Sequence, residues 1–190
     1  MEEINTTPNA NVNATVDANA DAIVNKVANS GLINLDLEDL YPAGPRMGID
    51  LADYLFQGLI LREKDFRTAL KEADWSTYQD AFVYIHCSAD AIVPLWAYML
   101  LSSQLAPFAK KVVFGSSEDL EAALYQEIIG AMDIQEFVDQ RVIVKGCSNK
   151  PVPNQAFVAL VQKIQPVVKS LMFGEACSTV PVFKKPREKK

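Results

Sequence analysis

One stretch decides the expected fold: Phe82-Val83-Tyr84-Ile85-His86-Cys87-Ser88, an apolar, strand-like run that ends in a Cys-Ser pair. The same pair ends the run 142–146 as Cys147-Ser148, and it recurs as Cys177-Ser178 after residues 170–176. These are the three cysteines of the chain, and a Val-Pro pair follows each, at residues 93–94, 152–153 and 180–181. Three cysteines placed at random would seldom share both features, so the pattern indicates a site.

The segments around this stretch alternate between strand-like and helix-like patterns. Strands are expected at residues 32–37, 58–61, 81–86, 111–115, 141–145 and 167–173, and helices at 17–28, 63–73, 90–106, 116–131 and 153–165. Strands that alternate with helices of ten or more residues favour right-handed crossovers and a largely parallel sheet. We therefore predict an α/β fold, a three-layer α/β/α arrangement with a mostly parallel sheet.

Length and composition suggest where this fold begins and ends. The chain has 190 residues, of which 49% are hydrophobic, enough for one domain with its own core. Residues 1–17 are polar and of low complexity, and we expect a disordered tail there. Residues 18–185 are expected to form a single α/β domain, and residues 186–190 a basic C-terminal tail.

Two parts of the chain look like copies of each other. The helix pattern Asp65-Phe66…Ala69-Leu70 matches Asp119-Leu120…Ala123-Leu124, and residues 74–80 match residues 133–139. Both parts lead through a strand into a Cys-Ser pair, with Gly146 as a one-residue insertion in the second copy. The sequence therefore predicts that the sheet is built from a duplicated β-α-β unit.

The cysteines are expected to meet because parallel strands all end at the same edge of a sheet, where open α/β sheets bind ligands. Cys87, Cys147 and Cys177 each follow a strand, and helix N-termini after the first two would favour a thiolate. Three thiolates suit zinc or an iron–sulfur cluster with one open position. A fourth ligand would come from water, a partner protein, His86, Asp90 or Glu175.

Three other interpretations stay open. In the first, the cysteines are small buried hydrophobic residues without chemistry. In the second, the protein is a thiol-dependent enzyme that uses Cys87 or Cys147 as its nucleophile. That enzyme needs a base, and the single histidine, His86, adjoins Cys87 on a strand, so the two side chains point to opposite faces. In the third, the protein is a partner-binding module, since residues 82–114 resemble the core of anti-sigma-factor-antagonist (STAS-type) domains, which bind partners.

Charge and hydropathy limit the classes of partner that the protein is expected to bind. The net charge of −6 argues against a nucleic acid or an anionic lipid surface as the main partner. No apolar stretch reaches the ~20 residues of a membrane span, and no signal-peptide pattern stands near the start. We therefore expect no membrane association and a cytoplasmic location.

Four stretches carry a resemblance to a known family: LILREKDF (59–66), CSADAIVP (87–94), KGCS (145–148) and PVVKSLMFGEACSTVP (166–181). They resemble an uncharacterised bacterial family, a domain of unknown function, over roughly residues 20–185. Its members are similar in being encoded beside iron–sulfur assembly components, so the resemblance implies iron–sulfur assembly proteins as partners. It favours an accessory protein of cluster assembly with a metal or cluster at Cys87, Cys147 and Cys177 over the enzyme and the module.

Overall fold

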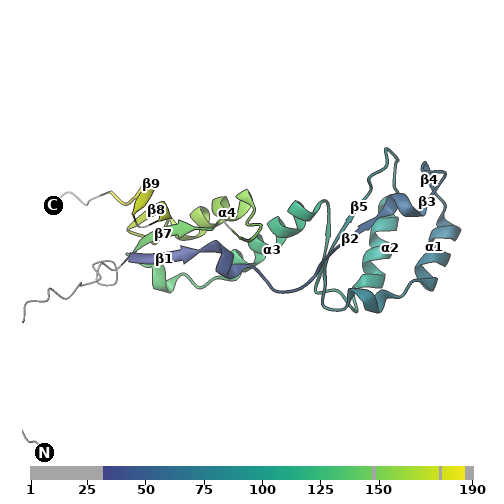
Figure 1. Ribbon diagram of the computed structural model, residues 1–190, viewed down its shortest axis with the longest axis horizontal. Coiled ribbons are helices and arrows are strands. Elements are labelled where there is room, and N and C mark those ends of the chain that lie inside the picture. The colour runs from purple at the N-terminus through teal and green to yellow at the C-terminus, as the bar shows by residue number, and fades with distance from the viewer. Residues whose placement is uncertain (1–31, 147–148, 176, 187–190) are drawn as a thin grey trace, which may run out of the picture.

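The computed structural model of the chain describes residues 32–146, 149–175 and 177–186, arranged as an elongated molecule (Figure 1). The tail expected at residues 1–17, the helix expected at 17–28 and the last four residues lie outside the described part. The α/β class is confirmed: four α-helices accompany mostly parallel strands in this part of the chain.

The described strands form one mostly parallel sheet, one fully parallel sheet and one small antiparallel hairpin. Sheet A has the order β1 (Leu32–Asp36), β7 (Arg141–Lys145), β8 (Ser170–Glu175), β9 (Ser178–Lys184), with only β9 antiparallel. Sheet B has the order β2 (Arg46–Asp50), β5 (Phe82–His86), β6 (Lys111–Phe114), all parallel. The hairpin joins β3 (Leu55–Phe56) to β4 (Ile60–Leu61).

Helices connect these strands. The α-helices are α1 (Glu63–Glu72), α2 (Leu95–Leu105), α3 (Ser117–Ala131) and α4 (Asn154–Ile164). Short 3₁₀ turns follow or precede strands: η1 (Leu37–Leu40), η2 (Leu51–Tyr54), η3 (Trp75–Tyr78) and η4 (Gln135–Phe137). We call residues 46–114 half B, and the described residues among 32–40 and 132–186 half A; α3 lies between the two (Figure 1).

The duplication is visible in the backbone, where most features of half B recur 59 residues later. Asp80 and Asp139 both adopt a left-handed conformation, with φ of 59° and 56°. Their N–H groups donate to the carbonyls of Phe108 and Val167, each just before the last parallel strand of its half. Ordinary residues seldom adopt positive φ, so this shared geometry marks equivalent corners. We call two residues that lie 59 positions apart in the chain counterparts of each other, and we use the same word for the elements that contain them.

The constant spacing corrects two details of the expected repeat. Helix α1 aligns with the C-terminal part of α3, so buried Phe66 corresponds to Tyr125 rather than to Leu120. The loops 87–93 and 146–152 have equal length, because His86 and Lys145 pair equivalently with β2 and β1 and both loops end at a helix-capping proline. By this spacing Gly146 is the counterpart of Cys87 rather than an insertion.

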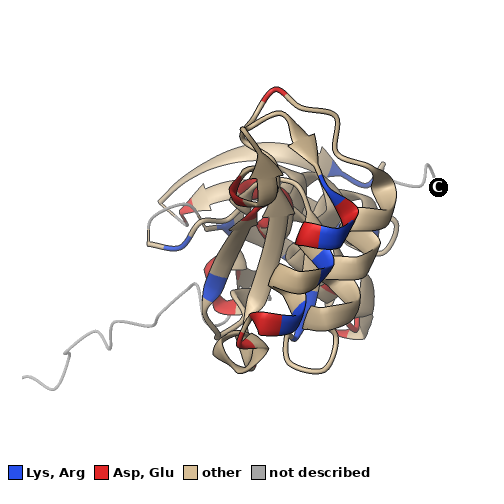
Figure 2. Ribbon diagram, turned by 90° about the vertical axis from the view of Figure 1, so that its right-hand side faces the viewer, with Lys and Arg blue, Asp and Glu red and all other residues tan. Residues whose placement is uncertain are grey.

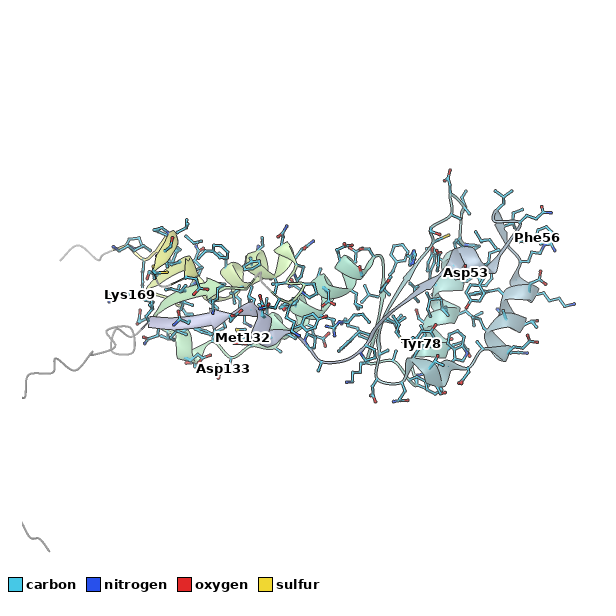
Figure 3. All side chains as sticks on the ribbon, in the orientation of Figure 1. Asp53, Phe56, Tyr78, Met132, Asp133 and Lys169 are labelled. Atoms are coloured by element: carbon cyan, nitrogen blue, oxygen red, sulfur yellow. The ribbon has the colours of Figure 1, made fainter. Side chains whose placement is uncertain are left out.

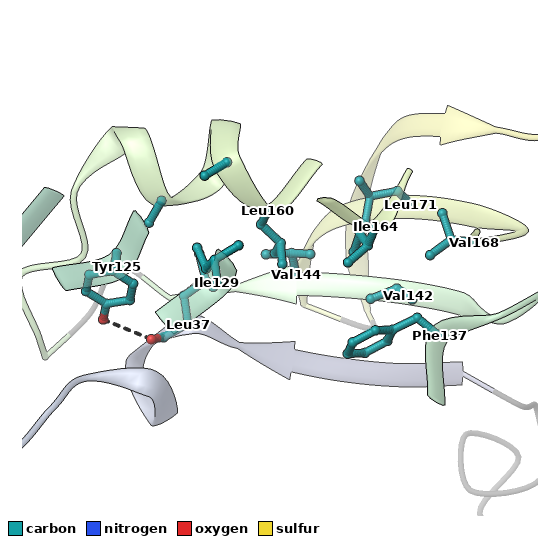
Figure 4. Close-up of a cluster of buried hydrophobic side chains, with 12 residues drawn as sticks. Leu37, Tyr125, Ile129, Phe137, Val142, Val144, Leu160, Ile164, Val168 and Leu171 are labelled. Carbon is teal, nitrogen blue, oxygen red and sulfur yellow. Dashed lines mark hydrogen bonds between the residues drawn. The ribbon is translucent and has the colours of Figure 1, made fainter. Parts of the chain in front are cut away.

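Helix α3 serves both sheets. Its first turns pack on sheet B, where Leu120 and Leu124 form a small cluster with Phe82. Its later turns pack on sheet A together with α4, and there Tyr125 donates a hydrogen bond to the Leu37 carbonyl at 2.9 Å (Figure 4). Because α1 and α2 cover the other face of sheet B, half B has the expected α/β/α layers.

The strands do not form the single sheet that was expected, and this is a correction. β5 and β7 are each central, but in different sheets. Residues 58–61 form part of the antiparallel hairpin instead of a parallel strand, and β2 takes that place beside β5. Helix α2 begins at Leu95, with Pro94 as its N-cap, rather than at residue 90 as expected.

The two sheets lie end to end. The Leu37 carbonyl that accepts from Tyr125 follows β1, at the carboxyl edge of sheet A. One turn earlier on α3, Glu121 pairs with Arg46, the first residue of β2 at the amino edge of sheet B. Figure 3 agrees: Lys169, just before β8, lies at the end of the molecule farthest from sheet B.

Candidate functional site

A cavity of about 530 Å³ opens at the carboxyl edge of sheet B. Parallel sheets bind ligands at this edge, because loops and helix N-termini converge there. We call it the rim cavity, and its lining residues come from the ends of β5 and β6, the following loops, α2 and the start of α3. They are Tyr84, His86, Cys87, Ala89, Ala91, Tyr98, Phe114, Gly115, Ser116 and Ser117.

Cys87 is half-buried in the wall of this cavity, directly after β5, as its position in the sequence predicted. Its Sγ donates to the Ala89 carbonyl at 3.6 Å, within the loop that leads to α2. The side chain packs against the core cluster beneath α1 and α2, and the residue also lines the cavity. The thiol is thus held in place and accessible.

His86 belongs to the other side of the strand. Its ring stacks on that of Tyr84, with centroids 5.7 Å apart, and Tyr84 packs on the cluster beneath α3. Cys87 packs on the opposite face, so strand alternation separates the thiol from the imidazole. This arrangement supports the argument made from the sequence against a Cys–His pair.

Asp50 stands beside His86 in the strand register and accepts hydrogen bonds from two backbone N–H groups, those of Ala52 at 2.9 Å and Ser88 at 3.0 Å. Desolvation acts to raise the pKa of this carboxyl, but hydrogen bonds from the Ser88 side chain and these backbone groups, with the charge of His86, bring it below its ordinary value. Asp50 is therefore a carboxylate at neutral pH, and it ties the Cys87–Ser88 turn to β2.

An aromatic pair forms the outer wall of the cavity. The Tyr98 ring of α2 meets the Phe114 ring of β6 edge to face, with centroids 5.1 Å apart. Burial, and next the charge of a Cys87 thiolate, raise the pKa of the Tyr98 hydroxyl, so it stays protonated and able to donate a hydrogen bond. Neither Tyr98 nor Phe114 lies in a sequence pattern that predicts a site.

The N-terminus of α3 borders the cavity but already carries an acidic partner. Ser116 and Asp119 form a capping box, in which each side chain accepts a hydrogen bond from the other residue's backbone N–H. Gly115, with φ of +129°, allows this turn, because a Cβ there would lie 2.4 Å from an Asp119 oxygen. A carboxylate at this helix end disfavours a second anion.

The equivalent region of half A keeps the aromatic pair and loses the polar groups. Phe157 and Phe173, the counterparts of Tyr98 and Phe114, also meet edge to face, at 5.7 Å. They line an almost wholly apolar groove of about 650 Å³ between α4 and strands β8 and β9. This recurrence is the signal through which the sequence could have identified Tyr98 and Phe114.

The structure does not bring the predicted thiolate ligands to one sheet edge. Cys177 is exposed in the turn between β8 and β9 of sheet A, near Glu175, whose carboxylate lies 3.8 Å from the Lys145 ammonium. Cys147 lies outside the described residues. Cys87 stands at the far edge of sheet B, beyond the roughly 13 Å that β2 spans. The shared-edge argument is therefore wrong for Cys87, and the described residues contain no group of three ligands suited to a metal.

Comparisons with curated proteins and with solved structures find no match for this chain. A family match covers residues 21–185, which include half B, half A up to residue 185 and every residue of the rim cavity. In the described part, no helix has both the length and the apolar character needed to cross a membrane. The chain belongs to the family described as "Protein of unknown function (DUF2480)".

Proposed function

We propose that this protein binds a small, flat organic molecule in the rim cavity and holds it against the Cys87 thiol. The observation that carries the proposal is the position of Cys87: a half-buried thiol in the wall of a 530 Å³ cavity, between an aromatic pair and the start of α3. A cavity of this volume matches a small-molecule site.

The lining favours a flat ligand. The Tyr84–His86 stack and the Tyr98–Phe114 pair offer aromatic surfaces from two sides of the strand ends. Aromatic contacts contribute about 1 kcal/mol each beyond area burial. The Tyr98 hydroxyl adds a donor whose proton is retained at neutral pH.

The charges favour a neutral or cationic ligand over an anion. Asp50 lies at the carboxyl edge of β2, next to His86, and is ionised at neutral pH. Asp119 occupies the N-terminus of α3, and hydrogen bonds from Ser116 lower the pKa of its carboxyl. Two carboxylates at one rim repel phosphate and carboxylate ligands.

Binding through the thiol is better supported than catalysis by it. A cysteine nucleophile needs a base or a nearby cation, and His86 lies on the other face of β5. We therefore assign Cys87 the role of a non-covalent contact for the ligand. The enzyme interpretation, with Cys87 or Cys147 as nucleophile, stays the alternative.

The experiment compares two maleimides on the purified protein, with peptide mass spectrometry to measure the labelling rate of each cysteine. N-phenylmaleimide is flat and aromatic, whereas N-ethylmaleimide is not. Exposed Cys177 is the reference thiol within the same chain. We expect Cys87 to prefer the aromatic reagent about fivefold more than Cys177 does, the ratio that ~1 kcal/mol of aromatic contact produces.

Two alanine variants make the comparison specific. Tyr98→Ala removes one wall of the rim cavity and should abolish the preference at Cys87. Phe157→Ala removes its counterpart in half A and should leave that preference unchanged. If the ratio of the two labelling rates, N-phenylmaleimide to N-ethylmaleimide, is the same at Cys87 and Cys177 in the unmodified protein, the proposal is wrong.

The metal interpretation is a separate prediction. Zinc or an iron–sulfur cluster on Cys87, Cys147 and Cys177 rests on the recurring cysteine pattern and on the family resemblance, which also implies iron–sulfur assembly proteins as partners. Metal analysis of anaerobically purified protein, repeated on Cys147→Ser, tests it directly. We also propose a cytoplasmic location, because free cysteines such as Cys87 and Cys177 persist in a reducing compartment.

A further inference from the structure

Sheet B ends in an edge strand whose counterpart in half A is covered. β6 is the last strand of sheet B in the described part of the chain, and it pairs only with β5. Its counterpart β8 pairs with β7 on one side and with antiparallel β9 on the other. The duplicated unit therefore lacks one strand in half B, at the open side of β6.

The open side of β6 carries hydrogen-bonding groups. The N–H of Gly115 donates to the Ile85 carbonyl on β5 at 2.9 Å. Backbone groups of alternate residues in a strand point to opposite sides, so the N–H and C=O groups of Val112 and Phe114 point away from β5. An edge strand with unpaired backbone groups can pair with a strand of another chain.

Large apolar side chains on β6, on α2 and in the loop before α2 are exposed to solvent. Exposed fractions are 94% for Ile92, 81% for Leu95, 73% for Met99 and 70% for Phe114. Leu95 and Met99 lie on α2 one turn apart, on the same side of the sheet as Phe114, which contacts Tyr98 of that helix. By contrast, α1 carries interleaved acidic and basic residues on its exposed side (Figure 2).

We propose that the open side of β6 is a dimer interface, which a second copy of this chain covers with its own β6. Antiparallel pairing about Val113 places Val112 of one copy opposite Phe114 of the other. Residues that face each other in this way exchange two hydrogen bonds, so the symmetric pair makes four. The partner's strand then does for β6 what β9 does for β8.

The apolar area is sufficient for such a dimer. At roughly 100 Å² of apolar surface per side chain, four residues in each of two copies remove on the order of 800 Å² from water. The strand backbones and helix flanks bring the total to about 1,000 Å², the lower bound of a specific interface. The pairing is self-complementary and closes after two copies, whereas β9 added to β6 of another copy would propagate without end.

Sedimentation equilibrium from about 1 to 100 µM, the range in which interfaces of this size associate, tests the proposal. We expect a species of twice the 21.0 kDa chain mass at the upper end. Phe114→Lys and Met99→Lys should each raise the dimer dissociation constant at least tenfold, because a lysine charge enters the apolar contact. Val158→Lys, which alters the 60%-exposed counterpart of Met99, should leave the dissociation constant unchanged.

Hydrogen exchange on the unmodified protein gives an independent readout, which does not depend on how any variant folds. The Val112 and Phe114 amides should exchange slowly at high concentration and quickly on dilution, while Gly115 is protected at both. A chain that stays monomeric up to 100 µM, or a dimer that Phe114→Lys leaves intact, overturns the proposal. Protection of these amides in a monomer also overturns it, because another segment then covers β6.

Discussion

Glu121 is the one charged residue that the described part of the chain buries, and it joins the two sheets. Its carboxylate accepts a 2.8 Å hydrogen bond from the Arg46 guanidinium, which also donates to the Pro42 and Gly44 carbonyls. The guanidinium lies 4.0 Å from the centroid of the Tyr41 ring. Each of these two charges neutralises the other. Removing either one therefore leaves an uncompensated charge and destabilises the fold.

Glu121→Gln should lower the free energy of unfolding by about 3 kcal/mol, since it leaves the largely but not fully buried Arg46 charge without its partner. Glu127→Gln on the same helix is the matched control: Glu127 pairs with Lys111 at an exposed position and should cost less than about 1 kcal/mol. Urea titration of the three proteins measures both. Equal losses would show that burial does not decide the effect.

The pKa of the Tyr125 hydroxyl gives a prediction of how the stability of the fold changes at alkaline pH. Burial first, then the charge of Glu121, raise the pKa of its hydroxyl from 10.0 to about 12. The folded state therefore holds this proton more tightly than the unfolded chain. Its contribution to stability is complete below pH 10 and is lost as the pH rises through about 12.

Tyr125→Phe should remove part of this alkaline loss. At neutral pH the variant should be about 1 kcal/mol less stable, because the Leu37 carbonyl loses its donor. Between about pH 10 and pH 12, the variant should then lose less stability than the unmodified protein. Guanidinium titrations at both pH values measure the difference. The same alkaline loss in both proteins would mean that Tyr125 does not ionise in this range.

At the scale of elements, the corners before β5 and β7 give a prediction for both copies of the repeat. Asp80 and Asp139 hold left-handed conformations that a β-branched residue adopts poorly. Asp80→Val and Asp139→Val should each cost about 1–2 kcal/mol, whereas Asp80→Asn and Asp139→Asn should cost little. Thermal unfolding of the four variants tests this. A valine variant as stable as its asparagine partner would contradict the assigned geometry.

The elements that the sequence predicts best are those with strong local patterns. The strands that became β5, β6 and β7 and the described helices α1, α3 and α4 were expected within one or two residues of their bounds, because apolar periodicity and caps are local signals, whereas α2 begins at Leu95 instead of residue 90. β2 was missed since Gly48, Arg46 and Asp50 leave little apolar alternation in it. β9 was missed because Pro181 is typical of a turn, although an antiparallel partner on one side tolerates it.

The number of sheets could not be predicted, because it depends on contacts between residues far apart in the chain. α3 has the pattern of an ordinary crossover helix, which fits either one sheet or two. Its pairing with Arg46, 75 residues away, fixes the end-to-end arrangement. The position of Cys87 at a strand end follows from local sequence and was predicted. Its separation from Cys177 depends on the arrangement of the two sheets and was not predicted.

At the scale of the whole molecule, this arrangement predicts which thiols can be joined. In a Cys147→Ser variant, a bismaleimide shorter than the roughly 13 Å that β2 spans should not link Cys87 to Cys177 within one chain. A bismaleimide with a long polyethylene glycol arm confirms that both thiols react. A short cross-link between residues 87 and 177, found by peptide mass spectrometry of the monomeric product, would revive the shared thiolate site.

The chain order couples the folding of the two halves. β1 precedes half B in the chain and its sheet partner β7 follows half B, so half B is inserted between two paired strands of half A. α3 then supplies buried residues to both cores, among them Leu120 in one and Ile129 in the other. When α3 detaches, each half loses the buried side chains that this helix contributes to its core. We therefore expect residues 18–185 to unfold as one domain.

Tryptophan fluorescence tests this coupling, because both tryptophans, Trp75 and Trp96, belong to half B. Leu160→Ala removes a fully buried side chain of half A and should cost about 3 kcal/mol. If the halves unfold together, this distant change shifts the fluorescence midpoint in urea as far as the circular dichroism midpoint. Leu101→Ala, its counterpart in half B, should shift both signals alike. A fluorescence transition that ignores Leu160→Ala would instead make the halves two domains, because α3 would then transmit no stability from sheet A to sheet B.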